Sequence, residues 1–257
     1  MSMSTYRRYV ALGDSQTEGL WDGDDETGLR GWADRLAEQL AELNPDLRYA
    51  NLAVRGKLAH EVRAEQLDAA LALQPDLATV VAGMNDLLRP GFDADAVASE
   101  LEQMFAALTE AGTRVATLTF PNVAKIVPIA RPLTHRVVSL NARIHEAATR
   151  HGVAILETFH HSVTTDPRIW SPDRLHANPL GHERIAAGMA YALDLPGSSE
   201  SWSEPLPPPP PSGTMHSTRT ELWWLASFVG PWIGRRVRGR SSGDGRSPKR
   251  PDLAPAR

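Results

Sequence analysis

Four short groups of residues in this chain carry the side chains that acyl-transfer chemistry needs. A serine, Ser15, follows glycine and aspartate near the N-terminus, and Asp173 and His176 stand three residues apart much later in the sequence. Gly56 and Asn85 lie between them and offer a backbone N–H and a side-chain amide. A hydroxyl, a base, a group that orients the base and donors for an oxyanion are the components of an acyl-transfer site.

Each group alone also has an ordinary structural explanation. A Gly-Asp-Ser sequence is typical of a tight turn. The Gly-Met-Asn-Asp sequence at 83–86 is typical of a helix cap or an Asx turn, and Asp173 and His176 can form a surface ion pair. The case for chemistry therefore depends on whether the fold brings the four groups together.

Five apolar runs alternate with helical patterns over the first 195 residues and predict strands at 9–12, 49–54, 77–82, 115–120 and 153–156. The runs are almost continuously apolar, as is typical of parallel strands covered on both faces. They predict an α/β fold, a three-layer α/β/α sandwich around a five-stranded parallel sheet. In such sheets the functional groups follow the carboxyl ends of the strands, which is where the four groups lie.

Apolar stripes at helical spacing predict the helices between these strands; the stripes are Trp32, Leu36, Leu40 and Leu43, then Val97, Leu101, Met104, Phe105 and Leu108. Gly112 and Gly152 mark expected helix ends. Asn178 as N-cap and Pro179 at the first position predict the start of the last helix, two residues after His176. A helix start fixed in this way holds a neighbouring side chain in place.

The four groups give the chain a resemblance to the SGNH hydrolases, also called GDSL-type esterases and lipases. The matching blocks are Gly13-Asp14-Ser15, the stretch from Asn51 to Gly56, Gly83-Met84-Asn85-Asp86, and Asp173 to His176. They occur in the order and spacing of that family, over residues 8 to about 193. One position departs from the family name, since Gln16 stands where leucine would follow the serine. The resemblance implies the flavodoxin-like fold of these hydrolases.

The resemblance also implies a role for each residue. Ser15 is the expected nucleophile, His176 the general base, and Asp173 the carboxylate that orients the imidazole. The backbone N–H groups of Ser15 and Gly56 and the Asn85 amide are the expected oxyanion donors. The substrate would be a small-molecule ester, and no cofactor is required.

The sequence says less about the roles of other residues near these blocks. Asp14 is expected to stabilise the turn rather than to join the triad. Trp21 and Trp170 are candidates for the wall of an acyl pocket, or for packed loop anchors. The histidines match no zinc-binding spacing and the chain has no cysteine, so we expect no metal site, disulfide or cysteine nucleophile.

Composition divides the chain into an acidic body and a basic tail. From residue 213 onward nine Lys and Arg stand against three Asp and Glu, although the whole chain has a net charge of −4. We expect a catalytic domain at 1–196, a proline-rich linker at 197–213, an amphipathic Trp- and Arg-rich helix at 214–240, and a disordered tail at 241–257. An acidic body argues against nucleic-acid binding.

The tail helix has three competing interpretations: it docks on the catalytic domain, lies on an anionic membrane surface, or binds a partner protein or, through charge alone, nucleic acid. The membrane interpretation depends on Trp223, Trp224 and Trp232 beside the arginines at 235–240. No segment has the apolar character of a secretory signal or a membrane span, so a cytoplasmic location is expected.

The leading functional hypothesis is a serine esterase acting on small or short-chain esters. An acyltransferase or thioesterase with the same triad is one alternative, because an acyl-enzyme can react with acceptors other than water. A non-catalytic binding module on the same scaffold is another. The natural substrate and the oligomeric state are left open by the sequence.

Overall fold

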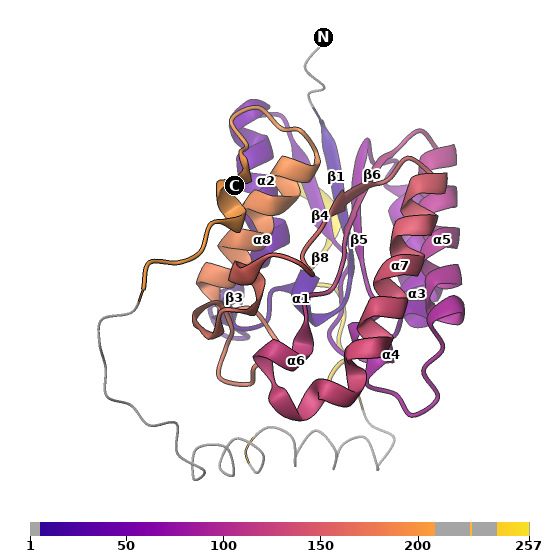
Figure 1. Ribbon diagram of the computed structural model, residues 1–257. Coiled ribbons are helices and arrows are strands. Elements are labelled where there is room, and N and C mark those ends of the chain that lie inside the picture. The colour runs from indigo at the N-terminus through magenta and orange to yellow at the C-terminus, as the bar shows by residue number, and fades with distance from the viewer. Residues whose placement is uncertain (1–5, 209–226, 228–240, 257) are drawn as a thin grey trace.

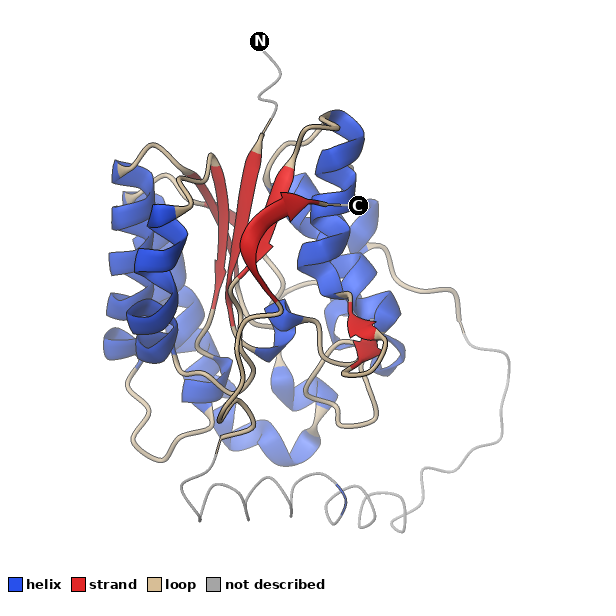
Figure 2. Cartoon of the chain, turned by 180° about the vertical axis from the view of Figure 1, so that it is seen from behind, coloured by secondary structure: helices blue, strands red, loops and turns tan. Residues whose placement is uncertain are grey.

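A six-stranded sheet lies at the centre of the molecule, between two layers of helices (Figures 1 and 2). The computed structural model describes residues 6–208, 227 and 241–256. In spatial order β7-β6-β5-β1-β4-β8, the first five strands are parallel and β8 runs antiparallel to β4. The strands are β1 (Arg8–Gly13), β4 (Arg48–Asn51), β5 (Leu77–Val81), β6 (Arg114–Leu118), β7 (Ala154–Leu156) and β8 (Arg250–Pro255). A separate hairpin pairs β2 (Gly23–Asp24) with β3 (Gly28–Leu29).

The two helical layers have different members. Helices α2 (Gly31–Leu43) and α8 (Pro179–Ala192) cover one face, and α3 (Ala59–Ala72), α5 (Ala94–Glu110) and α7 (Thr134–Arg150) cover the other (Figure 1). Short helices lie at the carboxyl end of the sheet or in its loops: α1 (Ser15–Glu18), α4 (Met84–Leu87), α6 (Val123–Ile126), and the 3-10 turns η1 (Pro128–Leu133), η2 (Ser162–Thr165), η3 (Pro167–Ile169) and η4 (Glu200–Ser203).

The apolar patterns of the sequence account for this arrangement. Strand β5 is buried along its whole length, as expected for a parallel strand with helices on both faces. Leu43, the last member of the first predicted stripe, is exposed at the end of α2, but Trp32 and Leu36 of α2 and Phe105 of α5 are fully buried in the core. Each such side chain contributes roughly 1.5–3 kcal/mol by its removal from water. The predicted three-layer architecture is confirmed.

The predicted number of strands is wrong, because the sheet has six strands rather than five. The additional strand, β8, comes from the tail at 241–257, for which the sequence predicted disorder. Strand β4 is the edge of the parallel sheet, and an edge strand presents unpaired N–H and C=O groups that a further strand can satisfy. The tail pairs with this edge despite a composition that does not favour strands, as Figure 2 shows.

The packed body also extends beyond residue 196, where the sequence placed the start of a linker. Trp202 in η4 is only 4% exposed, and its ring lies 4.7 Å from that of His161. Arg184 of α8 donates to the carbonyl oxygen of Ser201 at 2.7 Å, which holds η4 against this helix. The predicted helix at 214–240 lies outside the described residues, apart from Ser227.

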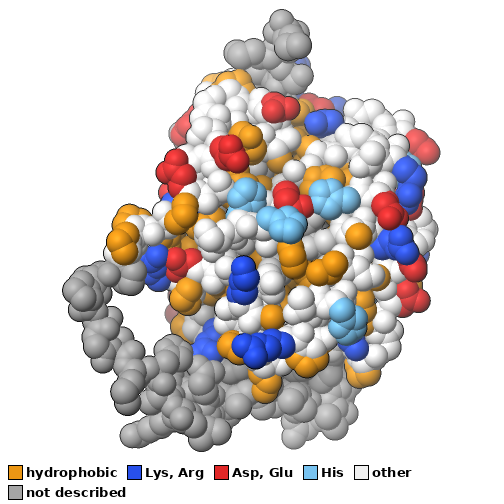
Figure 3. Space-filling model, viewed as in Figure 1, with side chains coloured by type: hydrophobic (Ala, Val, Ile, Leu, Met, Phe, Trp, Pro, Cys, Tyr) orange, Lys and Arg blue, Asp and Glu red, His pale blue; other side chains and the backbone are white. Residues whose placement is uncertain are grey.

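Charges of both signs are interspersed on the face of the molecule that Figure 3 shows, with hydrophobic side chains and histidine rings between them. Among the helices that the structure describes, none combines the length and the apolar character that crossing a bilayer requires.

Candidate active site

The nucleophile candidate lies in a turn at the carboxyl end of β1 that glycine makes possible. A β-carbon on Gly13 would lie 2.5 Å from the Val81 carbonyl oxygen, so a larger residue would push the turn away from β5. The buried Gln66 amide fixes Gly13 by accepting from its N–H and donating to its carbonyl, both at 2.9 Å. Asp14 then caps α1 by accepting from the Gln16 N–H, as expected of a turn-stabilising residue, and Ser15 is the first residue of α1.

The aspartate and histidine lie on a short loop whose ends are tied together before α8. Trp170 and Ala177 form an isolated antiparallel bridge, and the Ser171 N–H donates to the His176 carbonyl at 2.9 Å. The Asn178 side chain accepts from the Gly181 N–H at 3.0 Å, which confirms it as the N-cap of α8. The loop therefore presents its side chains from the start of a fixed helix.

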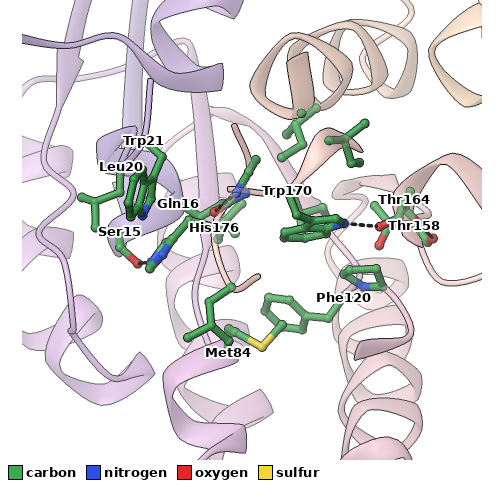
Figure 4. Close-up of a pocket in the computed structure, with 18 of the residues that line it drawn as sticks. Ser15, Gln16, Leu20, Trp21, Met84, Phe120, Thr158, Thr164, Trp170 and His176 are labelled. Atoms are coloured by element: carbon green, nitrogen blue, oxygen red, sulfur yellow. Dashed lines mark hydrogen bonds between the residues drawn. The ribbon is translucent and has the colours of Figure 1, made fainter. Parts of the chain in front are cut away.

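The fold brings Ser15, His176 and Asp173 into one hydrogen-bonded chain. His176 Nε2 lies 2.8 Å from Ser15 Oγ, and His176 Nδ1 lies 2.7 Å from Asp173 Oδ2. Figure 4 shows the serine and the imidazole facing each other at one side of the cavity. With Nδ1 protonated toward the carboxylate, Nε2 is free to accept the serine proton. This is the arrangement in which an imidazole acts as base for a hydroxyl.

The Asp173 carboxylate is held by several donors besides the imidazole. Oδ1 accepts from the Ser171 hydroxyl at 2.6 Å and from the N–H groups of Leu175 and His176 at 2.8 and 3.0 Å. Oδ2 also accepts from Trp21 Nε1 at 2.8 Å. Burial alone would raise the pKa of Asp173, but the His176, Ser171 and Leu175 hydrogen bonds outweigh it and hold that pKa well below its usual range. The group is therefore an anion throughout the neutral range.

Two of the three expected oxyanion donors are open. Within residues 6–208, 227 and 241–256, no group accepts a hydrogen bond from the backbone N–H of Ser15 or of Gly56. The Asn85 amide, in contrast, donates to Asp14 Oδ2 and to the Lys57 carbonyl, both at 3.0 Å. Asn85 lines the cavity, but its amide hydrogens are already directed at these two oxygens.

Asp14 is a buried carboxyl group next to the nucleophile. Burial raises its pKa to about 6, although the Gln16 N–H and the His176 charge act to lower it. Because Asp14 accepts from Asn85, its protonation near this pH would change the hydrogen bonding of the Asn85 amide. Asp14 is thus coupled to the site both through its hydrogen bond with Asn85 and through the charge of His176.

An ion pair fixes the loop that carries Gly56 relative to α1, the helix that begins at Ser15. Glu18, the last residue of α1, is buried and accepts from Arg55 Nη2 at 2.7 Å. It also accepts from the Arg55 backbone N–H at 2.7 Å. Since Arg55 directly precedes Gly56, this pair links the turn that carries Ser15 to the loop that carries the second open N–H group.

A cavity of about 380 Å³ opens beside Ser15 and His176. Leu156 at the end of β7 lines it. Phe120, which follows β6, and Trp170 lie across the cavity from Ser15 (Figure 4). A second apolar cavity of about 300 Å³ adjoins it and shares Met84, Leu88, Trp170 and Leu175. Both tryptophans singled out in the sequence lie in the cavity wall.

The two tryptophans nevertheless make different contacts. Trp170 Nε1 donates to the Thr164 carbonyl at 3.0 Å, which anchors the loop before α8. Trp21, in contrast, donates to the triad carboxylate and has a left-handed backbone with φ of 69°. That conformation is unfavourable for a bulky residue, so the surrounding contacts must hold it there.

Sequence reasoning missed several residues that shape the site. Gln16, the position that departs from the family name, accepts from the Ala177 N–H at 3.3 Å and so joins the serine turn to the histidine loop. The contacts of Ser171 and Trp21 with Asp173 were also missed, since nothing local in the sequence signals them. The sequence gives only a weak signal for Glu18 and Arg55, because residues of opposite charge lie next to the motifs that contain Ser15 and Gly56.

Within the described part of the chain, no group of three or more His, Asp or Glu could hold a metal ion.

Comparison with protein families identifies the chain. The model of the GDSL-like lipase/acylhydrolase family matches residues 11–184. The chain therefore belongs to this family, and the assignment supports a hydrolase that acts on esters. Among curated proteins, none matches the chain.

Solved structures of esterases and related hydrolases share the fold. LAE5, an alpha/beta hydrolase enzyme from the metagenome of Lake Arreo, is 21% identical, with a TM-score of 0.62 over 73% of this chain and 95% of that one. The psychrotrophic esterase EstA from Pseudoalteromonas sp. is 16% identical, with a TM-score of 0.57 over 73% and 97%. Axe2, an acetylxylan esterase from Geobacillus stearothermophilus, is 15% identical, with a TM-score of 0.62 over 79% and 99%. At these identities the likeness concerns the fold.

Proposed function

We propose that the protein is a serine esterase that cleaves carboxylic esters of small or short-chain substrates through an acyl-enzyme on Ser15. The observation that carries this proposal is the hydrogen-bonded chain from Ser15 through His176 to Asp173, with distances of 2.8 and 2.7 Å. The cavity of about 380 Å³ beside Ser15 offers room for a short acyl group. Family membership supports ester hydrolysis independently of this geometry.

Acylation follows from the positions of these groups. Ser15 Oγ attacks the ester carbonyl carbon while His176 Nε2 takes the hydroxyl proton. The imidazolium that forms is stabilised by the Asp173 anion, and the open N–H groups of Ser15 and Gly56 donate to the carbonyl oxygen as it gains negative charge. Asn85 joins them when its amide turns from Asp14. His176 then returns the proton to the leaving oxygen, and the alcohol departs.

Deacylation repeats the same proton transfers with water. His176 removes a proton from a water molecule, whose oxygen attacks the acyl carbon, and the proton then passes to Ser15 Oγ as the carboxylic acid leaves. No step requires a cofactor, since the protein supplies the nucleophile, the base and the oxyanion donors.

Replacement of the nucleophile tests the proposal. We expect the purified protein to hydrolyse p-nitrophenyl acetate and Ser15→Ala to lose at least about 1,000-fold in kcat, because the variant lacks the hydroxyl that forms the acyl-enzyme. An organophosphonate should label the wild type at Ser15, as mass spectrometry of its peptides would show. Ser162→Ala, a change in η2, serves as the control and should retain activity. An inactive, unlabelled wild type would instead favour a binding module.

A further inference from the structure

The C-terminal segment 241–256 returns to the active-site end of the molecule, outside the family match at 11–184. Strand β8 extends the sheet beside β4, and the residues before it pass over the loop that follows β4 (Figure 2). A β-carbon on Gly243 would overlap the Arg55 carbonyl oxygen, so the two backbones are in close contact. The segment thus packs on the body of the protein although it lies outside the residues that the family shares.

Ion pairs anchor this segment to the loops around the site. Arg246 Nη2 lies 2.7 Å from Asp25 Oδ2, and Asp25 also pairs with Arg55 at 2.9 Å. The Arg246 and Arg55 hydrogen bonds lower the pKa of Asp25 to about 2, so this carboxylate is charged throughout the neutral range. Lys249 Nζ lies 2.6 Å from Asp34 Oδ2 and donates to the Leu29 and Arg30 carbonyls, both at 2.9 Å.

Two serines of the segment lie directly on the glycine that offers an open N–H group. A β-carbon on Gly56 would overlap the Ser241 hydroxyl and lie 2.8 Å from Ser242 Oγ. Ser242 also lines the cavity that contains Ser15 and His176. Its side chain is exposed, and it makes no hydrogen bond with any residue that the structure describes. A free hydroxyl therefore faces the site beside the expected oxyanion position.

The sheet order separates the two sides of the site. An ester carbonyl carbon bonded to Ser15 Oγ carries an acyl group and an alkoxy group that point in different directions. On the β5-β6-β7 side the cavity wall is mostly apolar, with Leu118, Phe120 and Leu156, although threonines such as Thr119 and Thr158 also line it. On the β4-β8 side the wall is formed by Gly56 and the hydroxyl of Ser242. The apolar side suits the acyl chain, which leaves the polar side for the alcohol.

We propose that Ser242 is a specificity-determining residue that contacts the alcohol portion of the bound ester beside Gly56. This inference rests on the proposed esterase function. The C-terminal segment would then take part in selecting the substrate. The ion pairs of Arg246 with Asp25 and of Lys249 with Asp34 hold Ser242 in position.

The experiment compares two serines of the same segment in the full-length chain. Ser242→Leu fills the space beside Gly56, whereas the matched control Ser247→Leu changes an exposed serine that does not line the cavity. One series of substrates, ethyl acetate and 1-naphthyl acetate, varies the alcohol and keeps the acyl group constant. The other series, p-nitrophenyl acetate and p-nitrophenyl octanoate, varies the acyl group and keeps the alcohol constant. The measured quantity is kcat/KM for each ester.

We expect Ser242→Leu to lower kcat/KM for 1-naphthyl acetate by about tenfold relative to ethyl acetate, since an added side chain of this size discriminates by at least that factor. The octanoate-to-acetate ratio should stay within about twofold of wild type, and Ser247→Leu should change neither ratio. Unchanged ratios in Ser242→Leu, equal changes in both variants, or a response of the acyl series alone would each overturn the inference. Absence of hydrolysis by the wild type, or retained activity in Ser15→Ala, would instead refute the esterase proposal.

Discussion

Among single residues, Trp21 has a contact with a clear expected effect on the site, because it shares the Asp173 carboxylate with His176. Trp21 Nε1 and His176 Nδ1 both donate to Asp173 Oδ2, at 2.8 and 2.7 Å. Trp21→Phe keeps an aromatic ring in the cavity wall but removes this donor. Because the carboxylate is then held less firmly toward the imidazole, we expect kcat to fall about tenfold with little change in KM, as a lost hydrogen bond to a charged group would cause.

Trp202→Phe is the matched control for this prediction. Trp202 also lines the cavity, but its ring nitrogen has no hydrogen-bond partner among the described residues. Steady-state kinetics on p-nitrophenyl acetate should therefore show kcat within about twofold of wild type for this variant. If both variants lose kcat equally, the effect of Trp21 is one of cavity packing rather than of carboxylate positioning.

At the scale of elements, the cap of α8 serves both stability and the site. Asn178 accepts from Gly181 N–H, and its Nδ2 donates to the Arg168 and Trp170 carbonyls at 2.8 and 3.2 Å. Asn178→Ala loses the cap, worth about 1 kcal/mol, and these two contacts with the preceding loop. We expect the free energy of unfolding to fall by about 2 kcal/mol and kcat to fall as well, because His176 lies on that loop. Urea unfolding and steady-state kinetics measure the two effects.

The cap of α5 provides the comparison. Asp93 accepts from the Asp95 and Ala96 N–H groups, and α5 packs on the face of the sheet opposite α8. Asp93→Ala should cost about 1 kcal/mol of stability without a change in kcat. Equal losses of kcat in both variants would show that the rate follows overall stability and not the loop before α8.

Most of the fold could be predicted from local patterns, and the short motifs that contain Ser15, Asp173 and His176 picked out the three residues that the structure joins by hydrogen bonds. Buried parallel strands have continuous apolar runs, and Asn178 with Pro179 is a local helix start. The hydrogen bond of Trp21 to Asp173 joins residues 152 positions apart, and no local pattern encodes it. Strand β8 was missed because its exposed, proline-containing sequence has no strand pattern. It forms because the β4 edge and the Arg246 and Lys249 ion pairs are present.

At the scale of the whole molecule, a buried histidine joins three separate parts of the chain. His182 of α8 accepts from the Trp32 N–H of α2 at 3.1 Å and donates to the Leu20 carbonyl, in the loop after α1, at 2.9 Å. Burial is the main cause that lowers its pKa to about 4; the Leu20 hydrogen bond and Asp22 oppose that lowering, and the His176 and Arg35 charges add to it. The neutral ring is therefore the form that fits the folded structure.

This depressed pKa predicts a loss of stability in acid. Between a pKa of about 6.5 in the unfolded chain and about 4 in the folded protein, the unfolded state binds more protons at His182, so the free energy of unfolding falls as the pH falls. At about pH 5 the loss amounts to about 2 kcal/mol relative to about pH 7.5. The buried carboxyls Asp14 and Asp34, whose pKa values are raised to about 6, act in the opposite direction over the same range.

Comparison of the wild type with a His182 variant separates the effect of the histidine from that of Asp14 and Asp34, because both proteins contain these two carboxyl groups. His182→Gln has no titrating group at this position but keeps an amide that can donate and accept. Urea unfolding at about pH 7.5 and about pH 5 should show the stability advantage of the wild type over this variant shrinking by about 2 kcal/mol in acid. A constant difference at the two pH values would mean that His182 titrates alike in the folded and unfolded states. In that case the junction of α1, α2 and α8 would not be the acid-sensitive point of the structure.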